Sequence, residues 1–293
     1  MNDVIIIGAG IGGLTLALAL DRRGIPCRVY EAAPEIRGLG LGINILPHAT
    51  RELAELGLEG DLAAVAVTTR EAVFYNRFGQ LVPGEPLGRH AGYDWPQFSI
   101  RRGCQLVSWV GEFHTPKYKL RDWNRAGDLA DFIHVFEDWK FDWLDVPAMI
   151  RNAETILEYP MVDQEPLSRW SFGRVTLLGD AAHPMVPRGS NGAGQAILDA
   201  RALADCLARR ADPVEALKEY EARRLEATAS VVRMNRANPP DAILREVYVR
   251  TGDRPFRSID EVISREELTA LTTGYAKVAG YDQETLRSKS GLE

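Results

Sequence analysis

The stretch that decides the fold is residues 4–13, which read VIIIGAGIGG. Four apolar residues typical of a short buried strand lead into a glycine turn, and an alanine- and leucine-rich run over residues 14–20 follows as a helix. Gly8 permits the tight turn, Gly10 lets the backbone approach a pyrophosphate, and Gly13 lets the helix and the strand come close together. This spacing is typical of a dinucleotide-binding turn.

An acidic residue completes this pattern. Residues 27–30 form a second strand, and Glu31 closes it, about 20 positions after the glycines, where a carboxylate accepts hydrogen bonds from ribose hydroxyls. A glycine turn that only served close packing would not require this acid. The strand, the turn, the helix and Glu31 together predict a dinucleotide site.

Composition narrows the class of protein. The 293 residues include 35 basic and 41 acidic side chains, a net charge of −6 without long runs of one sign, so we expect neither a nucleic-acid partner nor a stable membrane association. No apolar run approaches the ~18 residues that span a bilayer, and no secretory leader pattern is present. The three cysteines, Cys27, Cys104 and Cys206, fit no metal or disulfide spacing. We therefore expect a cytoplasmic protein without a metal site.

A second motif has the same plan as the first, with an apolar strand, a glycine, an acidic residue and a following helix. Residues 174–178 are a further apolar strand, which runs directly into Gly179 and Asp180. Two predicted helices follow at 192–209 and 213–235. An acid at the tip of a strand can bind a polyol hydroxyl, and the unpaired amides at the start of the helix at 192 attract an anionic group.

At this second motif the chain resembles a known family. Residues 179–184, GDAAHP, followed by a glycine-rich helix start, are similar to the signature of the FAD-dependent aromatic-ring monooxygenases, and most of all to the phenazine-modifying hydroxylases of the pyocyanin-forming type. Further matching segments lie at residues 40–45, 98–103, 106–110 and 156–163. The resemblance implies an α/β fold, with a Rossmann-like FAD-binding domain of the glutathione-reductase type, a reduced β-sheet substrate domain and a C-terminal helical tail.

The resemblance also implies domain limits and site residues. It implies a discontinuous FAD-binding domain at 1–70 and 155–236, a remnant of the substrate-binding sheet and helices at 71–154, and a tail at 237–293. The implied FAD contacts are Gly8, Gly10, Ile11, Gly13, Glu31, Arg37, Gly42, Ile43, Arg102, Gly179, Asp180, Pro187, Gly192, Ala193 and Gly194.

No catalytic side chain is expected with certainty, because the flavin carries the reaction. The resemblance implies that Tyr159, Met161 and Pro187 face the flavin or the substrate. His183 is open to two interpretations, an acid–base group or a hydrogen-bonding part of the turn. We favour the second interpretation.

One departure from the family is large. In relatives, the arginine–glycine pair that matches Arg102 and Gly103 is followed by a helix, two strands and an Asp-Gly motif that contacts FAD and the nicotinamide nucleotide. Here Gly103 passes directly to Cys104, and a segment of about a hundred residues, the size of a small domain, is absent. That segment includes a strand of the FAD-domain sheet and much of the sheet over the substrate.

Three functional hypotheses follow. The first, which we favour, is a flavin-dependent monooxygenase that uses NADPH or NADH and dioxygen to hydroxylate a small aromatic or heteroaromatic molecule. The second is a catalytically impaired remnant that still binds FAD. The third is an NAD(P)-dependent dehydrogenase that uses only the first glycine turn, and the second motif argues against it. Because strand edges are left uncovered by the absent segment, we also expect association into homo-oligomers.

Overall fold

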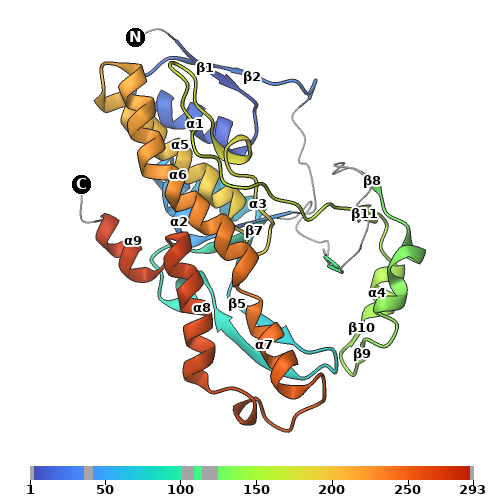
Figure 1. Ribbon diagram of the computed structural model, residues 1–293. Helices are drawn as coiled ribbons and strands as arrows, with labels where there is room; N and C mark the ends of the chain where they lie inside the picture. Colours follow the sequence, from blue (N-terminus) through green and yellow to red (C-terminus); the bar gives the residue numbers. More distant parts are fainter. Residues whose placement is uncertain (1–2, 36–41, 101–108, 114–124, 291–293) are drawn as a thin grey trace.

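The computed structural model describes residues 3–35, 42–100, 109–113 and 125–290 (Figure 1). Its strands are β1 Val4–Ile7, β2 Cys27–Tyr30, β3 Ile43–Ile45, β4 Val67–Thr69, β5 Glu71–Tyr75, β6 Leu81–Pro86, β7 Gln97–Ile100, β8 Arg125–Ala126, β9 Lys140–Phe141, β10 Leu144–Asp145 and β11 Leu157–Glu158. Its α-helices are α1 Ile11–Asp21, α2 Pro47–Glu55, α3 Glu59–Val65, α4 Val146–Arg151, α5 Gly192–Arg209, α6 Pro213–Ala237, α7 Ala242–Thr251, α8 Arg265–Ala279 and α9 Gln283–Ser290.

The chain begins with the predicted Rossmann unit. β1 and β2 are parallel, with Val4 beside Cys27 and Ile7 beside Tyr30, and α1 connects them. This unit confirms the predicted α/β class: a strand, a glycine turn and a helix lead to a second strand that is parallel to the first.

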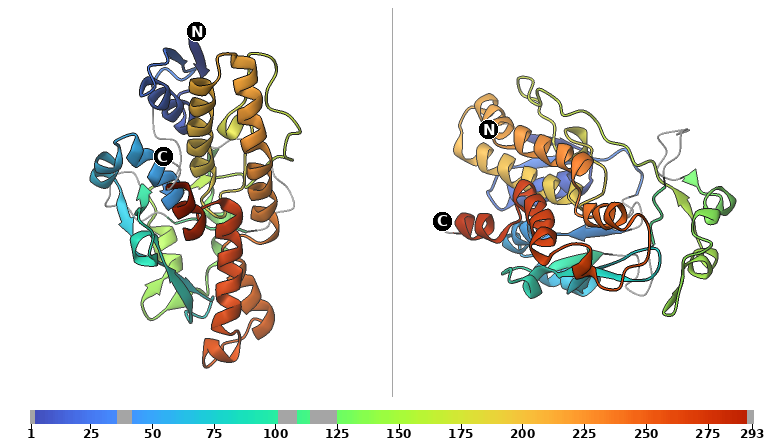
Figure 2. Two further views of the ribbon diagram at one scale, coloured as in Figure 1. Left: turned by 90° about the vertical axis from the view of Figure 1, so that its left-hand side faces the viewer. Right: turned by 60° about the horizontal axis from the view of Figure 1, so that its bottom comes forward.

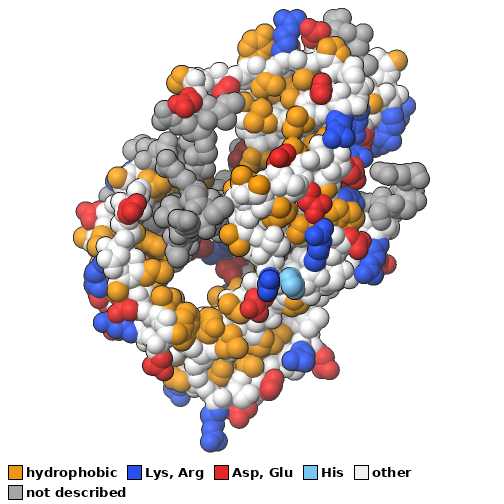
Figure 3. Space-filling view, turned by 180° about the vertical axis from the view of Figure 1, so that it is seen from behind, with side chains coloured by type: hydrophobic (Ala, Val, Ile, Leu, Met, Phe, Trp, Pro, Cys, Tyr) orange, Lys and Arg blue, Asp and Glu red, His pale blue; other side chains and the backbone are white. Residues whose placement is uncertain are grey.

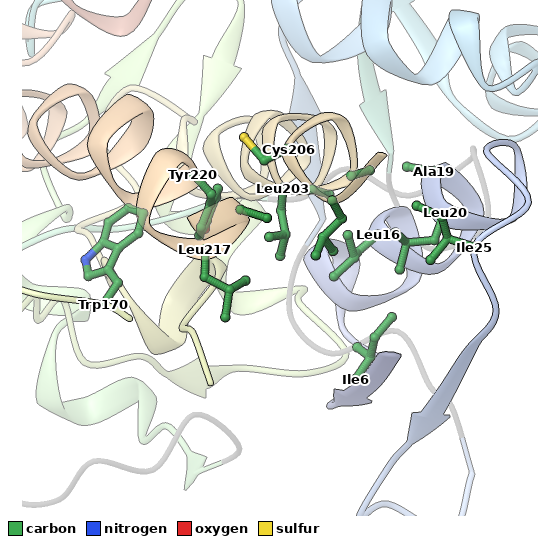
Figure 4. Packing of buried hydrophobic residues seen from close by; sticks show 14 of the residues in the cluster. Ile6, Leu16, Ala19, Leu20, Ile25, Trp170, Leu203, Cys206, Leu217 and Tyr220 are labelled. Carbon is green, nitrogen blue, oxygen red and sulfur yellow. The ribbon is translucent and has the colours of Figure 1, made fainter. Parts of the chain in front are cut away.

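The largest core lies between this unit and two long helices. Ile6 of β1 faces Leu16 of α1, and Leu203 of α5 and Tyr220 of α6 complete the cluster together with Trp170 (Figure 4). All five side chains are buried. Burial of apolar side chains of this size contributes roughly 1.5–3 kcal/mol each, so this cluster fixes α1, α5 and α6 against one face of β1.

The other face of β1 is uncovered. Ile5 and Ile7, which alternate with buried Ile6, are 62% and 80% exposed. Among the described residues, β1 has only one strand neighbour, β2. An apolar face and an unpaired edge therefore coincide on the same strand.

The predicted strand at 174–178 is wrong. These residues form no strand; a single bridge joins Phe172 to Val175, and Val175 is 63% exposed. A strand exists through the ladder that it forms with a neighbour. In the described part of the chain no strand pairs with residues 174–178, and the segment that is absent includes, by the resemblance, a further strand of the FAD-domain sheet.

The middle of the chain forms small sheets. β7 pairs with β3 on one side and β4 on the other, and β5 and β6 form a hairpin with an irregularity between Ala72 and Phe74. The C-terminal tail packs on this hairpin, where Val82 of β6 is enclosed by Ile243, Val247, Ile263 and Leu268. The tail is thus part of the folded body and not an appendage.

Two expectations for the middle of the chain need correction. Residues 127–139 have helical spacing but form two short 3-10 turns, Leu129–Asp131 and Ile133–Val135, because Phe132 between them has φ −139° and leaves the helical region. The alternation of apolar and polar residues over 105–112 predicts a strand, but residues 105–108 lie outside the described residues and residues 109–112 form no strand.

The views from other sides show how the parts are arranged. In Figure 1 and in the right-hand view of Figure 2, the segment with α4, β9 and β10 stands apart from α5, α6 and α8. Figure 3 shows hydrophobic side chains gathered around a hollow in the face seen from behind. No helix in the described ranges combines the length and the apolar character that crossing a bilayer requires.

Candidate FAD site

The first glycine turn leaves room where a phosphate needs it. Gly8 has φ +104° and its amide donates to the Tyr30 carbonyl at 2.7 Å. A methyl group added at Gly8 or Gly10 would meet no atom within 4 Å, whereas at Gly13 it would overlap the Gly8 carbonyl. The first two glycines therefore border open space, and the third serves the close contact of helix and strand.

The start of α1 offers unpaired amides to this space. α1 begins after Gly10, and no side chain within the described part of the chain caps it. Its first turn also contains no acidic residue. The backbone N–H groups of that turn and the positive end of the helix dipole are therefore available to an anion.

Glu31 lies beside the same turn. Its carboxylate accepts hydrogen bonds from the amides of Ala33, at 2.8 Å, and Ala9, at 2.7 Å. These two backbone bonds lower the pKa of Glu31 below its ordinary value, so the group is ionised near neutral pH. Each carboxylate oxygen accepts more than one hydrogen bond, and the exposed side chain keeps capacity for ribose hydroxyls.

The second turn presents an acid to solvent. Gly179 is buried with φ +61° and opens the 3-10 turn Gly179–Ala181. Asp180, the next residue, is exposed. Burial, and to a smaller extent the negative charge of Asp180, raise the pKa of Tyr159.

The two turns meet at one place. A methyl group at Gly12 of α1 would overlap the side chain of Leu178 and lie 3.3 Å from Cβ of Ala196 in α5. A methyl group at Gly179 would lie 3.2 Å from the same Ala196 atom. The start of α1, the Asp180 turn and the first turns of α5 are therefore in mutual contact, although their sequences are far apart.

The loop before α5 is hydrogen-bonded to β3. Ser190 has φ +53°, and its hydroxyl accepts a hydrogen bond from Asn44 Nδ2 at 3.0 Å. Ser99 on β7 in turn donates to Asn44 Oδ1 at 2.9 Å. These bonds bring β3, which begins at Ile43, against the glycine-rich loop.

The remaining predicted site residues lie in several parts of the chain. Gly42 and Ile43 lie at the start of β3; Gly192, Ala193 and Gly194 open α5; and Pro187 is exposed in the loop before it. Met161 is half-buried two residues beyond Tyr159. Arg37 and Arg102 lie outside the described residues.

Sequence reasoning missed a buried charge cluster behind the second turn. His183 Nε2 lies 2.5 Å from Asp199 Oδ2, and Arg224 Nε donates to Asp199 Oδ1 at 2.7 Å. The acidic and basic residues at 215–224 suggest a solvated helix face, which is wrong for Arg224, because its side chain is mostly buried. One signal was available: Asp199 stands at core spacing between Ala196 and Leu203.

These observations agree with the chemistry of FAD. Two open glycine positions and an uncapped helix start suit a pyrophosphate, while two exposed carboxylates, Glu31 and Asp180, suit the hydroxyl groups of a ribose and a ribityl chain. The described residues contain no group of three or more side chains arranged to hold a metal ion.

A separate aromatic pocket of about 190 Å³ lies in the middle of the chain. Its lining includes Tyr75, Trp109, Phe136 and Trp139. None of the predicted flavin-facing residues lines it, so it is distinct from the glycine turns.

Comparison with known proteins defines the class. Residues 153–235 match the family model described as FAD binding domain, and residues 6–51 match the model described as NAD(P)-binding Rossmann-like domain. The phenazine 1,6-dicarboxylic acid hydroxylase of Lysobacter antibioticus is 30% identical over an alignment that includes 94% of this chain and 97% of that enzyme. The 3-hydroxybenzoate 6-hydroxylase 1 of Aquipseudomonas alcaligenes is 27% identical, with 80% of this chain and 88% of that enzyme covered.

Solved structures agree with this class. The fold is similar to that of 2-methyl-3-hydroxypyridine-5-carboxylic acid oxygenase in a tetrameric form, with TM-score 0.66, 18% identity and 98% of each chain covered. It is also similar to CtdE in complex with FAD and a substrate, with TM-score 0.70, 15% identity and coverage of 94% and 98%. The chain belongs to the family of FAD-dependent aromatic hydroxylases, and FAD is its cofactor.

The alignment with the Lysobacter enzyme also reveals a segment that this chain lacks. The alignment with the Lysobacter enzyme has 405 positions, whereas 94% of this 293-residue chain is about 275 residues, so roughly 130 aligned positions hold no residue of this chain. This size agrees with the absence of a segment as large as a small domain. The expected junction at Gly103 and Cys104 lies outside the described residues.

Proposed function

We propose that this protein is a monooxygenase that uses NADPH or NADH and dioxygen to hydroxylate a small aromatic or heteroaromatic molecule. The observation that carries the proposal is the meeting of two acid-tipped glycine turns at Gly12, Gly179 and Ala196. When bound, FAD supplies the redox chemistry: it accepts electrons from a nicotinamide nucleotide and activates dioxygen.

The chain's own residues bind and orient the cofactor. Gly8, Gly10 and the amides that open α1 hold the pyrophosphate, and Glu31 accepts bonds from the adenosine ribose. Asp180 accepts bonds from the ribityl chain. Pro187 and the amides at 192–194 border the flavin ring from one side, and Gly42 and Ile43 border it from the other.

Two further assignments complete the proposal. Tyr159 and Met161 line the substrate side of the flavin, with Arg37 and Arg102 as additional cofactor contacts. The FAD-binding domain comprises 1–70 and 155–236, the substrate-domain remnant 71–154 and the helical tail 237–293. The protein works in the cytoplasm. It forms homo-oligomers, and the uncovered edge of β1 supports this part of the proposal.

A second candidate has its own support. A second set of observations favours an FAD-binding protein with impaired turnover: the uncovered face of β1, the lack of a strand at residues 174–178, and the roughly 130 aligned positions that hold no residue of this chain. In that case the cofactor site is intact and the cover over the substrate is incomplete.

One series of measurements separates the candidates. The purified chain should carry the visible absorption bands of bound flavin, and a colourless protein that takes up no added FAD would contradict both candidates. Anaerobic addition of NADPH or NADH should bleach these bands. Dioxygen is then added with phenazine-1,6-dicarboxylic acid or 3-hydroxybenzoate as a trial substrate. Hydroxylated product supports the first candidate, and peroxide without product supports the second.

A further inference from the structure

The Asp180 turn rests on a carboxylate that is entirely buried. Asp199 of α5 has no exposed surface, and it accepts three hydrogen bonds. Gly179 N–H donates at 3.1 Å, His183 Nε2 lies at 2.5 Å, and Arg224 Nε donates at 2.7 Å. Because a carboxylate only accepts, His183 Nε2 must be the donor.

This carboxylate is held in its charged form. Burial alone would raise the pKa of Asp199, but the charge of Arg224 and the hydrogen bond from His183 outweigh burial and lower it. Removal of a partner from a buried charge is strongly destabilising, because the charge is then left uncompensated. The three donors are therefore fixed relative to one another.

The bonds continue into two more elements. Arg224 of α6 also donates to Gln195 Oε1 at 2.6 Å, and Gln195 Nε2 donates to the carbonyl of Ala279, the last residue of α8, at 3.0 Å. The buried network thus connects α5, α6 and α8 to the backbone of Gly179.

Asp199 and Asp180 lie on opposite sides of the same turn. The buried carboxylate bonds the backbone of Gly179 from inside, and the neighbouring Asp180 is exposed. His183, three residues further on, is held by the same carboxylate. One acceptor therefore fixes the residue before Asp180 and a residue shortly after the turn.

We infer that Asp199 is a positioning residue for FAD: by bonding Gly179 and His183, it sets the direction in which Asp180 presents its carboxylate to the ribityl chain. The inference rests on the proposed placement of Asp180 at the flavin. A purely structural role would stabilise the protein as a whole without any special coupling to Asp180.

The test is a double-mutant cycle on FAD affinity. Apoproteins of the parent, Asp180→Ala, Asp199→Asn and the double variant are titrated with FAD, and binding is followed by quenching of flavin fluorescence. Asp199→Asn should weaken binding about tenfold or more, the effect of a lost charge-assisted hydrogen bond. In the Asp199→Asn background, Asp180→Ala should then cost less than about threefold, because coupled sites are not additive.

A matched control lies on the same helix. Asp205 of α5 is bonded to Arg201 Nε at 3.1 Å and pairs with Arg23, but it does not contact the turn. Asp205→Asn should leave the cost of Asp180→Ala unchanged. Hydrogen exchange in the apoprotein gives a readout without flavin: amides of residues 176–184 should exchange faster in Asp199→Asn than in Asp205→Asn.

A second pair of variants covers the case in which Asp199→Asn fails to fold. His183→Leu removes one donor and leaves the Asp199–Arg224 pair intact, and His183→Gln restores an N–H donor. His183→Leu should weaken FAD binding, and His183→Gln should recover at least part of the loss.

The outcomes separate the inference from the proposed site. If Asp180→Ala binds FAD as the parent does, the placement of Asp180 fails and the inference fails with it. If Asp180→Ala weakens binding and its cost is the same in the Asp199→Asn background, only the inference is overturned. Equal affinity of His183→Leu, His183→Gln and the parent also overturns it.

Discussion

At the residue scale, the first glycine turn makes a clear prediction for Gly10. Because a Cβ atom at this position meets no protein atom within 4 Å, Gly10→Val should fold like the parent. The valine would occupy the space of the pyrophosphate, so the purified variant should lack flavin. Gly60→Val is the matched control, since Gly60 of α3 also borders open space. A Gly10→Val protein as yellow as the parent would contradict the assignment.

Asp180 gives the second prediction at this scale. A hydrogen bond from a ribityl hydroxyl to a carboxylate contributes about 1.5–3 kcal/mol, roughly tenfold to a hundredfold in affinity. Asp180→Ala should weaken FAD binding by that factor. Because Asp180 is exposed, thermal unfolding of the apoprotein should be unchanged. Unaltered affinity in a titration would remove Asp180 from the site.

Individual residues of the site differ in how far the sequence predicts them. The glycine turn at 8–13 and the acid at Asp180 were predictable, because their chemistry depends on neighbours in the sequence. The Asp199–Arg224 pair was not, because it joins residues 25 positions apart on two different helices and exists only once these helices pack. A charged residue at core spacing is a signal of such a pair but does not identify its partner.

At the element scale, α8 supports the loop before α5. Tyr275 accepts a hydrogen bond from Asn191 at 3.0 Å and donates one to Asn235 at 2.6 Å. Burial raises the pKa of Tyr275 to about 12, so the hydroxyl keeps the proton that it donates. Tyr275→Phe leaves the buried Asn235 oxygen without its donor and should lower the free energy of unfolding by about 1–3 kcal/mol.

Chemical denaturation of the apoprotein measures this loss. Tyr248→Phe is the control, because Tyr248 on α7 is 58% exposed and its hydroxyl can bond water. Equal unfolding free energies for the two variants would show that the Tyr275 bonds contribute nothing to stability.

Elements differ in how far the sequence predicts them. α5 and α6 follow from local periodicity, since each helix satisfies its own backbone. Residues 174–178 have the composition of a strand but form none, because a strand needs a neighbour that the sequence pattern of one segment does not supply. α9 was missed because its eight residues, QETLRSKS, contain a single large apolar side chain, Leu286.

At the scale of the whole molecule, the uncovered strand predicts self-association. Exposed apolar edges recruit other chains, so the mass in solution should exceed that of one 32.5 kDa chain. Ile5→Lys places a charge on the uncovered face and should shift the protein toward the monomer. Val249→Lys is the control, because Val249 is an equally exposed apolar residue on α7. A monomeric parent would contradict this prediction.

The absence of the segment after Gly103 also predicts inefficient turnover. A site that admits water favours reduction of dioxygen to peroxide over transfer of oxygen to the substrate. We therefore expect more peroxide than hydroxylated product per NADPH consumed. Parallel assays of NADPH oxidation, peroxide and product test this expectation. Coupling of most of the NADPH to product would show that the shortened chain is a compact, working enzyme.

The contacts of α8 with the start of α5 have a consequence for synthesis of the protein. The first glycine turn leaves the ribosome well before Tyr275 and Ala279, which bond Asn191 and Gln195. At roughly 5–20 residues per second, translation reaches Ala279 about 15–50 seconds after Gly13. FAD should therefore bind firmly only after α8 has left the ribosome, and a nascent protein stopped before α8 should hold the cofactor poorly.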